Sequence, residues 1–211
     1  MRLRSLPHFR ALFLLLAIAV PALISVQEAR GDGYDMTGEH IGEEPTQQQS
    51  NGGGWLSEIR IGYFAHDVDA VSFNRENGND FNGELIFDSP DNQIFRDIYA
   101  PRLRFGTTIN DSDNTSHVYG GLLWDTEIWN GSGFFEFGLG GAVHDGETYT
   151  YERDRKSLGS RVLFHLSAGI GINVTPSNNI SLYLEHISNG YLADPNEGMD
   201  NVGIRYGLRF D

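Results

Sequence analysis

Apolar and polar residues alternate one by one through most of the chain after residue 54, and no stretch there shows helical periodicity. Successive side chains of a β-strand point to opposite faces, so this alternation predicts strands with one apolar and one polar face. Eight such stretches can be distinguished, of which the second is the weakest: 55–63, 82–87, 99–109, 118–128, 135–143, 162–173, 181–188 and 202–210. The predicted fold class is therefore all-β.

The same alternation fits two architectures. The apolar face points inward in a soluble β-sandwich or lipocalin-like barrel, and outward to lipid in a membrane barrel. Three features favour the membrane barrel: aromatic residues near the strand ends, glycines on the opposite face, and an alternating terminal strand with a penultimate aromatic residue. The aromatic residues are Trp55, Tyr99, Trp129, Tyr206 and Phe210. Residues 55–211 are predicted to form an eight-stranded antiparallel transmembrane β-barrel of the bacterial outer membrane.

The connections between the predicted strands differ in length. Tight turns are predicted at 129–132 and 175–178, where turn-forming residues cluster. The other connections are polar and mostly longer: 67–81, 109–115, 144–160 and 189–200. Outer-membrane barrels carry short turns on the periplasmic side and long loops outside, so the loop 189–200 is predicted to face the cell exterior.

The N-terminal part of the chain has the features of a secretory signal. Three arginines flank or precede an apolar stretch from Ala11 to Ile24, which is too short to span a bilayer comfortably. Residues 1–29 are predicted to be a signal peptide cleaved between about residues 22 and 29, with an uncleaved anchor as the alternative. Residues 30–54 are polar, acidic and rich in glycine, and are predicted to be a flexible linker.

The composition excludes several classes of function. The chain has 211 residues and a formal net charge of −14, which argues against nucleic-acid binding because a phosphate backbone attracts a basic surface. It contains no cysteine, so disulfides, zinc–thiolate sites and thiol catalysis are excluded. No cofactor and no metal site are predicted.

Charged residues fall on the face opposite the apolar one. An eight-stranded barrel is filled by its own side chains, and unpaired buried charge is costly. These groups are therefore predicted to form a salt-bridged lumen, with Glu185 and Arg205 as one pair; a catalytic or proton-relay role is the alternative. The residues are Glu58, Arg60, Arg102, Arg104, Asp125, Glu127, Glu136, Glu185 and Arg205.

The last two predicted strands bring together residue types that catalyse acyl transfer. Ser188 and His186 lie two positions apart on the apolar face, and Asp200 has the same facing on the final strand. A serine hydroxyl becomes a nucleophile when a histidine takes its proton, and a carboxylate on the other ring nitrogen orients that histidine. The alternative is an interfacial belt of polar side chains without catalysis. Candidate oxyanion donors lie nearby: Asn189, Gly190 and Asn196.

The motif His-Ile-Ser-Asn-Gly at 186–190, followed by Pro-Asn-Glu-Gly-Met-Asp at 195–200, resembles a known family. It is similar to the His-x-Ser-Asn … Pro-Asn-x-Gly motif of the outer-membrane lipid A deacylases, the PagL family. The resemblance implies an eight-stranded outer-membrane barrel that hydrolyses the ester-linked primary acyl chain at the 3-position of lipid A. It also implies a Ser-His-Glu triad on the lipid-facing side, near the outer leaflet.

Carried over residue by residue, the resemblance implies that Ser188 is the nucleophile and His186 the general base. Asp200 stands where the family has glutamate, and its shorter side chain is expected to reach His186 through a backbone shift. Glu197 is an alternative acid, although the alternation of side chains places it off the face that carries Ser188 and His186. The residues that match family positions near the oxyanion are Asn189, Gly190 and Asn196.

The partners implied by the resemblance are lipid A or lipopolysaccharide as substrate and the outer-membrane lipids around the barrel. A homodimer is left open. The acidic loops could recruit divalent cations that bridge lipopolysaccharide phosphates, but solvated loops are the simpler interpretation. A non-enzymatic outer-membrane barrel, structural or adhesive, is the alternative function. The acidic loop residues are Asp67, Asp69, Asp111, Asp113, Asp145 and Glu147.

Overall fold

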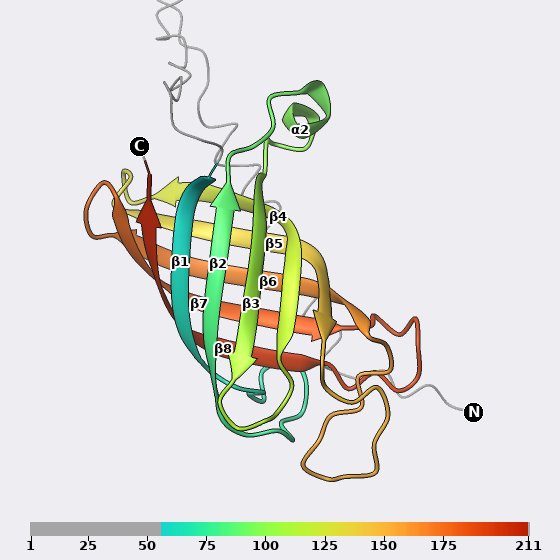
Figure 1. The fold of residues 1–211 in the computed structure, drawn as a ribbon. Helices are drawn as coiled ribbons and strands as arrows, with labels where there is room; N and C mark the ends of the chain where they lie inside the picture. Colours follow the sequence, from blue (N-terminus) through green and yellow to red (C-terminus); the bar gives the residue numbers. More distant parts are fainter. Residues whose placement is uncertain (1–55, 211) are drawn as a thin grey trace, which may run out of the picture. The chain divides into compact units, whose positions relative to one another are not determined.

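The computed structural model describes residues 56–210, which form a closed β-barrel with one short helix (Figure 1). The predicted signal peptide and linker lie outside these residues, so the structure leaves both predictions untested. The elements, in chain order, are β1 (Leu56–Ala65), β2 (Asn79–Phe87), α2 (Gln93–Asp97), β3 (Arg102–Asn110), β4 (His117–Ile128), β5 (Gly133–His144), β6 (Val162–Asn173), β7 (Asn178–Ser188) and β8 (Met199–Arg209).

Every strand pairs antiparallel with its neighbours in the sequence, and β8 pairs with β1 to close the barrel. At this closing seam Ile61 lies opposite Tyr206. Within the closed part of the barrel each strand is paired on both sides, which satisfies the backbone N–H and C=O groups that lipid cannot hydrogen-bond. The predicted eight-stranded antiparallel barrel is confirmed.

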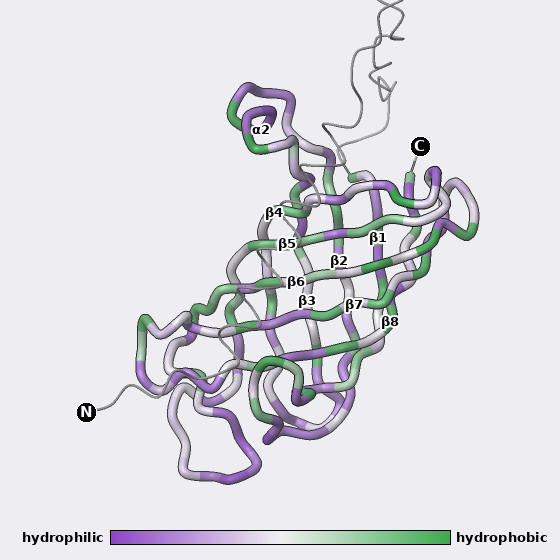
Figure 2. Tube along the Cα trace, turned by 180° about the vertical axis from the view of Figure 1, so that it is seen from behind, coloured by the Kyte–Doolittle hydropathy of each residue, from purple (hydrophilic) through white to green (hydrophobic). Residues whose placement is uncertain are grey.

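The barrel is apolar outside and polar inside. The outward side chains of Ile61, Leu182 and Ile204 are 62%, 56% and 61% exposed, whereas the inward Arg60 and Glu136 are fully buried. Figure 2 shows that hydrophobic and hydrophilic residues alternate along the strands. The arrangement excludes the soluble sandwich or lipocalin-like alternative, because a water-soluble barrel buries its apolar face.

The charges inside the barrel form an ion-paired network. Arg60 contacts Glu58 at 2.8 Å and Glu136 at 2.7 Å. Arg205 contacts Glu84 at 2.8 Å and also pairs with Glu136. All five residues are buried, so this pairing offsets the cost of removing each charge from water. The salt-bridged lumen predicted from the sequence is confirmed.

One predicted pair in the lumen is wrong. The β7–β8 register places Asn201 opposite Glu185 and Ser181 opposite Arg205, so the two charges lie four residues apart along the strands. Glu185 instead accepts a hydrogen bond from Asn201 over 2.9 Å and contacts two histidines. Parity therefore predicted the correct face, but the register decided the partner.

Two other residues expected in the lumen lie outside it. β4 pairs with β3 only as far as Leu123, opposite Arg102, and then continues paired with β5 alone. Asp125 and Glu127 lie on this extension and are exposed. Asp125 still finds a partner, since Arg102 contacts it at 2.9 Å. The closed part of the barrel is therefore shorter than the strand itself.

The two ends of the barrel carry different connections, as Figure 1 shows. One end gathers the loops 66–78, 111–116, 145–161 and 189–198, as predicted, and the other carries the turns 129–132 and 174–177. The connection 88–101 lies at the end with the turns and contains α2, which was not predicted and whose first turn is capped by Asn92. A helix of five residues is too short to show periodicity in the sequence. Among the described residues, no helix is long and apolar enough to cross a membrane.

Replacing Arg205 with methionine tests the lumen network. The change leaves Glu84 and Glu136 with less positive charge in a buried site, so we expect the free energy of unfolding to fall by about 3–5 kcal/mol. Urea unfolding of the refolded barrel in detergent micelles measures the change. The matched control is Arg96→Ala, which removes an exposed partner of Asp91 and should change stability by less than about 0.5 kcal/mol. Equal losses in the two variants would contradict a network that depends on buried pairing.

Candidate active site

The outward face of β7 and β8 brings a histidine and a carboxylate together at the end that carries the long loops. The register places His186 directly opposite Asp200. His186 Nδ1 donates a hydrogen bond to Asp200 Oδ1 over 2.6 Å. The aspartate therefore reaches the ring across a regular strand pair, without the backbone shift expected from the sequence.

The second carboxylate oxygen of Asp200 is held by the loop 66–78. Asp200 Oδ2 accepts hydrogen bonds from the backbone N–H groups of Val71 and Ser72, over 2.7 and 2.5 Å, and from Ser72 Oγ over 2.9 Å. The backbone N–H of Val68 donates to the carbonyl oxygen of Asp200 over 2.7 Å. Because three donors occupy Oδ2, the carboxylate is oriented with Oδ1 toward His186.

Ser188 lies on the same face of β7, two residues after His186. Strand geometry separates the two Cα atoms by about 6.5–7 Å and points both side chains the same way. His186 Nε2 and Ser188 Oγ make no hydrogen bond to another residue that the structure describes. Gly198, with a φ of +65°, packs against the ring, since a Cβ there would lie 3.0 Å from His186 Cε1. The ring nitrogen that a general base uses is therefore not engaged by the described residues.

The outer loops cover this part of the face, which differs from the lipid-facing site expected from the sequence. Leu182 on the same face is 56% exposed, but His186 and Ser188 are only 7% and 8% exposed. The cover comes from the loop 66–78, which bonds to Asp200, and from the loop 189–198 that follows Ser188. The site thus lies at the rim of the barrel, just beyond the exposed apolar band.

Asn189 fastens the loop that follows β7. Its side-chain amide donates to the carbonyl oxygens of Leu158 and Pro195, over 2.9 and 2.8 Å. Its backbone N–H donates to Asn196 Oδ1 over 2.9 Å. Because every N–H of Asn189 is engaged, this residue supports the loop. Asn196 Nδ2 and the Gly190 N–H have no hydrogen-bond partner among residues 56–210 and remain as candidate oxyanion donors.

Glu197 does not contact His186. Its carboxylate accepts a hydrogen bond from the Ser157 backbone N–H over 2.7 Å and pairs with Arg75 at 2.7 Å. It therefore links the loop 145–161 to the loop 66–78. The geometry favours Asp200 over Glu197 as the acid partner of the histidine.

A cation that was not predicted from the sequence connects the outer loops to Asp200 through Ser72. Lys156 is the only lysine of the chain, and its side chain is fully buried. Its Nζ lies 2.8 Å from Asp67 Oδ1 and 3.1 Å from Ser72 Oγ. The sequence carries one signal for this contact, a single lysine among acidic loops. A lysine that becomes buried on folding must pair with a carboxylate. Asp67, considered above as a cation ligand, is engaged by this ion pair.

His66 extends the same network. Its Nδ1 lies 2.9 Å from Asp80 Oδ1 and its Nε2 lies 3.1 Å from Glu76 Oε2. Burial alone lowers the pKa of His66, but hydrogen bonds with Asp80 and Glu76 outweigh it and raise the pKa to about 9. Burial acts to raise the pKa of Glu76, whereas hydrogen bonds, first among them the one with His66, lower it to about 2. At neutral pH this cluster is a charged histidine held between two carboxylates.

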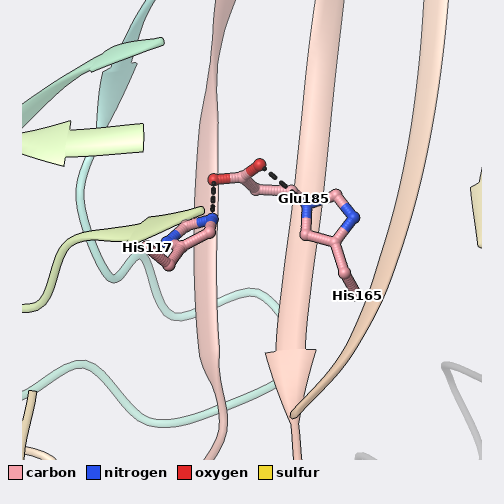
Figure 3. A group of neighbouring side chains, drawn as sticks. All are labelled: His117, His165 and Glu185. Carbon is pink, nitrogen blue, oxygen red and sulfur yellow. Dashed lines mark hydrogen bonds and ion pairs between the residues drawn. The ribbon is translucent and has the colours of Figure 1, made fainter. Parts of the chain in front are cut away.

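Three inward side chains lie close enough to hold a metal ion: His117 on β4, His165 on β6 and Glu185 on β7 (Figure 3). Glu185 lies 3.3 Å from His117 Nε2 and 3.1 Å from His165 Nε2. His165 Nδ1 also lies 3.0 Å from Arg104, which can only donate, so the neutral ring carries its proton on Nε2, toward Glu185. A metal ligand needs a lone pair at that nitrogen, and the guanidinium repels a cation. The three residues are therefore better described as a polar cluster of the lumen.

Comparison with known proteins supplies the family. Residues 98–209, just over half of the 211 residues, match the family model described as lipid A 3-O-deacylase (PagL). The chain belongs to the lipid A 3-O-deacylase (PagL) family. The family resemblance predicted from the motif is confirmed, and the matched range contains β7, β8 and all the candidate site residues named from the sequence.

Two members of this family can be compared directly. The chain is 35% identical over 83 residues to lipid A deacylase PagL of Bordetella bronchiseptica, and the alignment covers 39% of this chain and 44% of that protein. It thus spans under half the length of this curated relative. The crystal structure of the outer membrane enzyme PagL matches with a TM-score of 0.56 and 18% identity, over 73% of this chain and 100% of that one. Family and fold together identify an integral β-barrel of the outer membrane.

The raised pKa of His66 predicts a pH-dependent stability. Its ordinary value is 6.5 and its folded value about 9, so its contribution is complete below pH 6.5 and is lost as the pH rises through 9. We expect the urea midpoint of the refolded barrel to fall between about pH 6.5 and pH 9.5, and to fall less in His66→Gln. Equal falls in both proteins would show that another group carries the pH dependence.

Proposed function

We propose that this chain is a serine esterase that hydrolyses the 3-O-linked primary acyl chain of lipid A in the outer leaflet. The observation that carries the proposal is the 2.6 Å hydrogen bond from His186 Nδ1 to Asp200 Oδ1, on the face that also carries Ser188. Serine, histidine and a carboxylate are the residue types of a Ser-His-acid triad, which activates serine for acyl transfer. Membership of the lipid A 3-O-deacylase family supports the reaction class.

In the proposed mechanism, Ser188 Oγ attacks the ester carbonyl carbon while His186 Nε2 takes the hydroxyl proton. Asp200 keeps the proton of the neutral ring on Nδ1 and stabilises the imidazolium. The tetrahedral intermediate breaks the bond to the sugar oxygen, which receives the proton from His186, and an acyl-enzyme remains. A water molecule that loses its proton to His186 then releases the fatty acid and restores Ser188.

The negative charge of the tetrahedral intermediate requires donors that are already in place. We assign this role to the Gly190 N–H and to Asn196 Nδ2, because neither has a partner among the described residues and both belong to the loop next to Ser188. Asn189 is assigned to hold that loop, through its hydrogen bonds to Leu158 and Pro195.

The position of the site suits a substrate that stays in the membrane. His186 and Ser188 lie on the outward face of β7, beyond exposed apolar residues such as Leu182. The loops that cover them lie at the end predicted to face the cell exterior, where the ester bonds of lipid A meet the headgroup region. The substrate would therefore reach the serine by lateral diffusion, and no step of the mechanism calls for a metal or cofactor.

Replacing Ser188 with alanine removes the proposed nucleophile. We expect a Gram-negative host that produces the intact chain to lose one 3-hydroxy fatty acid from its lipid A. In Ser188→Ala the hydrolysis rate should be lower by at least about a thousandfold, so a host that produces this variant should show no loss. Mass spectrometry of lipid A measures both. Heat-modifiable migration on gels serves as the folding control. Unchanged lipid A from two folded barrels would favour the non-enzymatic alternative, and full activity in Ser188→Ala would refute the assignment of the nucleophile.

Alanine at Asp200 and at Glu197 separates the two candidate acids. Asp200→Ala removes the partner of His186 Nδ1, so we expect the deacylation rate to fall roughly 10³–10⁴-fold. Glu197→Ala breaks contacts between loops and should lower the rate by less than about tenfold. Both rates can be measured with purified lipid A and the refolded barrels. The reverse order of the two losses would make Glu197 the triad acid.

A further inference from the structure

We propose that Ser72 and Lys156 are positioning residues, which hold the carboxylate of Asp200 on His186 through a chain of contacts from two outer loops. The inference rests on the proposed function for its kinetic consequence, because it concerns the acid of the proposed triad. Neither residue acts on the substrate itself. Ser72 lies outside the residues matched by the family model, 98–209, so the family match does not supply this role.

The hydroxyl of Ser72 connects the lysine to the aspartate. Ser72 Oγ donates to Asp200 Oδ2 over 2.9 Å and accepts a hydrogen bond from Lys156 Nζ over 3.1 Å. A hydroxyl has one proton, and an ammonium group can only donate. The contact with Lys156 therefore directs the proton of Ser72 toward Asp200, and both side chains are buried.

Lys156 is itself fixed from two sides. Its Nζ pairs with Asp67 at 2.8 Å, and its backbone N–H donates to Glu76 Oε1 over 3.0 Å. Asp67 in turn accepts hydrogen bonds from the backbone N–H groups of Arg75 and Glu76, over 2.7 and 3.0 Å. The ammonium group of Lys156 thus joins the loop 145–161 to the loop 66–78, next to the Ser72 hydroxyl that contacts Asp200.

The contacts fix the plane of the Asp200 carboxylate. A carboxylate can rotate about its last single bond, and a rotated group places no oxygen in line with His186 Nδ1. Donors from Ser72 and Val71 occupy Oδ2, which leaves Oδ1 for His186 Nδ1. The hydroxyl is the side-chain member of this set, and the ammonium group determines where its proton points.

The hydroxyl of Ser72 can be tested separately from the contacts that attach its loop to Asp200. Its backbone N–H and that of Val71 donate to Asp200 whatever the side chain is, so Ser72→Ala keeps the loop attached and removes only the oriented hydroxyl. Ser72→Thr keeps the hydroxyl. Ser116→Ala is the control, because Ser116 is another serine of the outer loops whose hydroxyl is hydrogen-bonded. Its Oγ accepts the backbone N–H of Asn110 over 3.0 Å but lies outside the contacts of Asp200.

The first readout does not depend on activity. A histidine Nδ1–H bonded to a buried carboxylate gives a downfield, slowly exchanging proton signal, which NMR of the folded barrel in micelles detects for His186. We expect Ser72→Ala to broaden this signal or speed its exchange with water at least about fivefold, and Ser72→Thr and Ser116→Ala to leave it as in the intact chain. An unchanged signal in Ser72→Ala, or an equal change in Ser116→Ala, overturns the proposal.

The second readout is the split between kcat and KM for lipid A hydrolysis. We expect Ser72→Ala to lower kcat about tenfold with KM unchanged, as for the loss of one hydrogen bond to a charged group, and Ser72→Thr to recover most of it. The double variant Asp67→Asn with Lys156→Met removes both buried charges together, which avoids leaving one of them unpaired. It should lower kcat severalfold without changing KM; an unchanged kcat overturns the role of Lys156.

The two readouts separate this inference from the proposed function. A folded, intact chain that releases no fatty acid, combined with a perturbed His186 signal in Ser72→Ala, refutes the esterase but supports the positioning of the His186–Asp200 pair. An active intact chain, combined with an unperturbed signal and an unchanged kcat in Ser72→Ala, supports the esterase and overturns the positioning role.

Discussion

A strand that crosses lipid must find a partner for every backbone N–H and C=O group, because the hydrocarbon offers none. In this protein the requirement is met by closing β8 onto β1. Closure then divides the side chains by parity, so that apolar residues face lipid and the rest fill a narrow interior. The interior holds arginines and glutamates that are tolerated only because they are paired, as in the contacts of Arg60 and Arg205.

The candidate site lies at the rim of the barrel, where polar side chains replace apolar ones on the outward face. Register alone places His186 opposite Asp200, on a face that otherwise meets lipid. Polar groups on such a face need cover and partners, and the outer loops supply both. The loop 66–78 brings three donors to Asp200 Oδ2, and Lys156 reaches the same place from the loop 145–161. The strands thus set the distance between the histidine and the acid, and the loops set the orientation of the carboxylate.

The differences between expectation and structure have physical causes. The alternation of side chains predicted an ion pair between Glu185 and Arg205, because both residues face the lumen. The alternation does not determine the register between two strands, which decides which residues lie opposite each other. Asn189 was predicted to be an oxyanion donor, but its N–H groups donate to Asn196, Leu158 and Pro195 instead. These hydrogen bonds hold the loop that carries the other candidate oxyanion donors. α2 has one turn, and a single turn leaves no periodic trace in the sequence. Lys156 joins groups that are far apart in sequence, which only the folded loops bring together.

The sequence by itself determined the barrel, its inside-out polarity, the paired charge of its lumen, the family motif and the shared facing of Ser188, His186 and Asp200. Each of these follows from a period of two or from local residue types, which are properties of neighbouring positions. The tertiary structure decided the rest: the partner of each lumen charge, the choice of Asp200 over Glu197 beside His186, and the contacts that link Lys156 to Ser72 and Ser72 to Asp200. These depend on register and on the path of long polar loops, and both are set by packing between residues that the sequence keeps far apart.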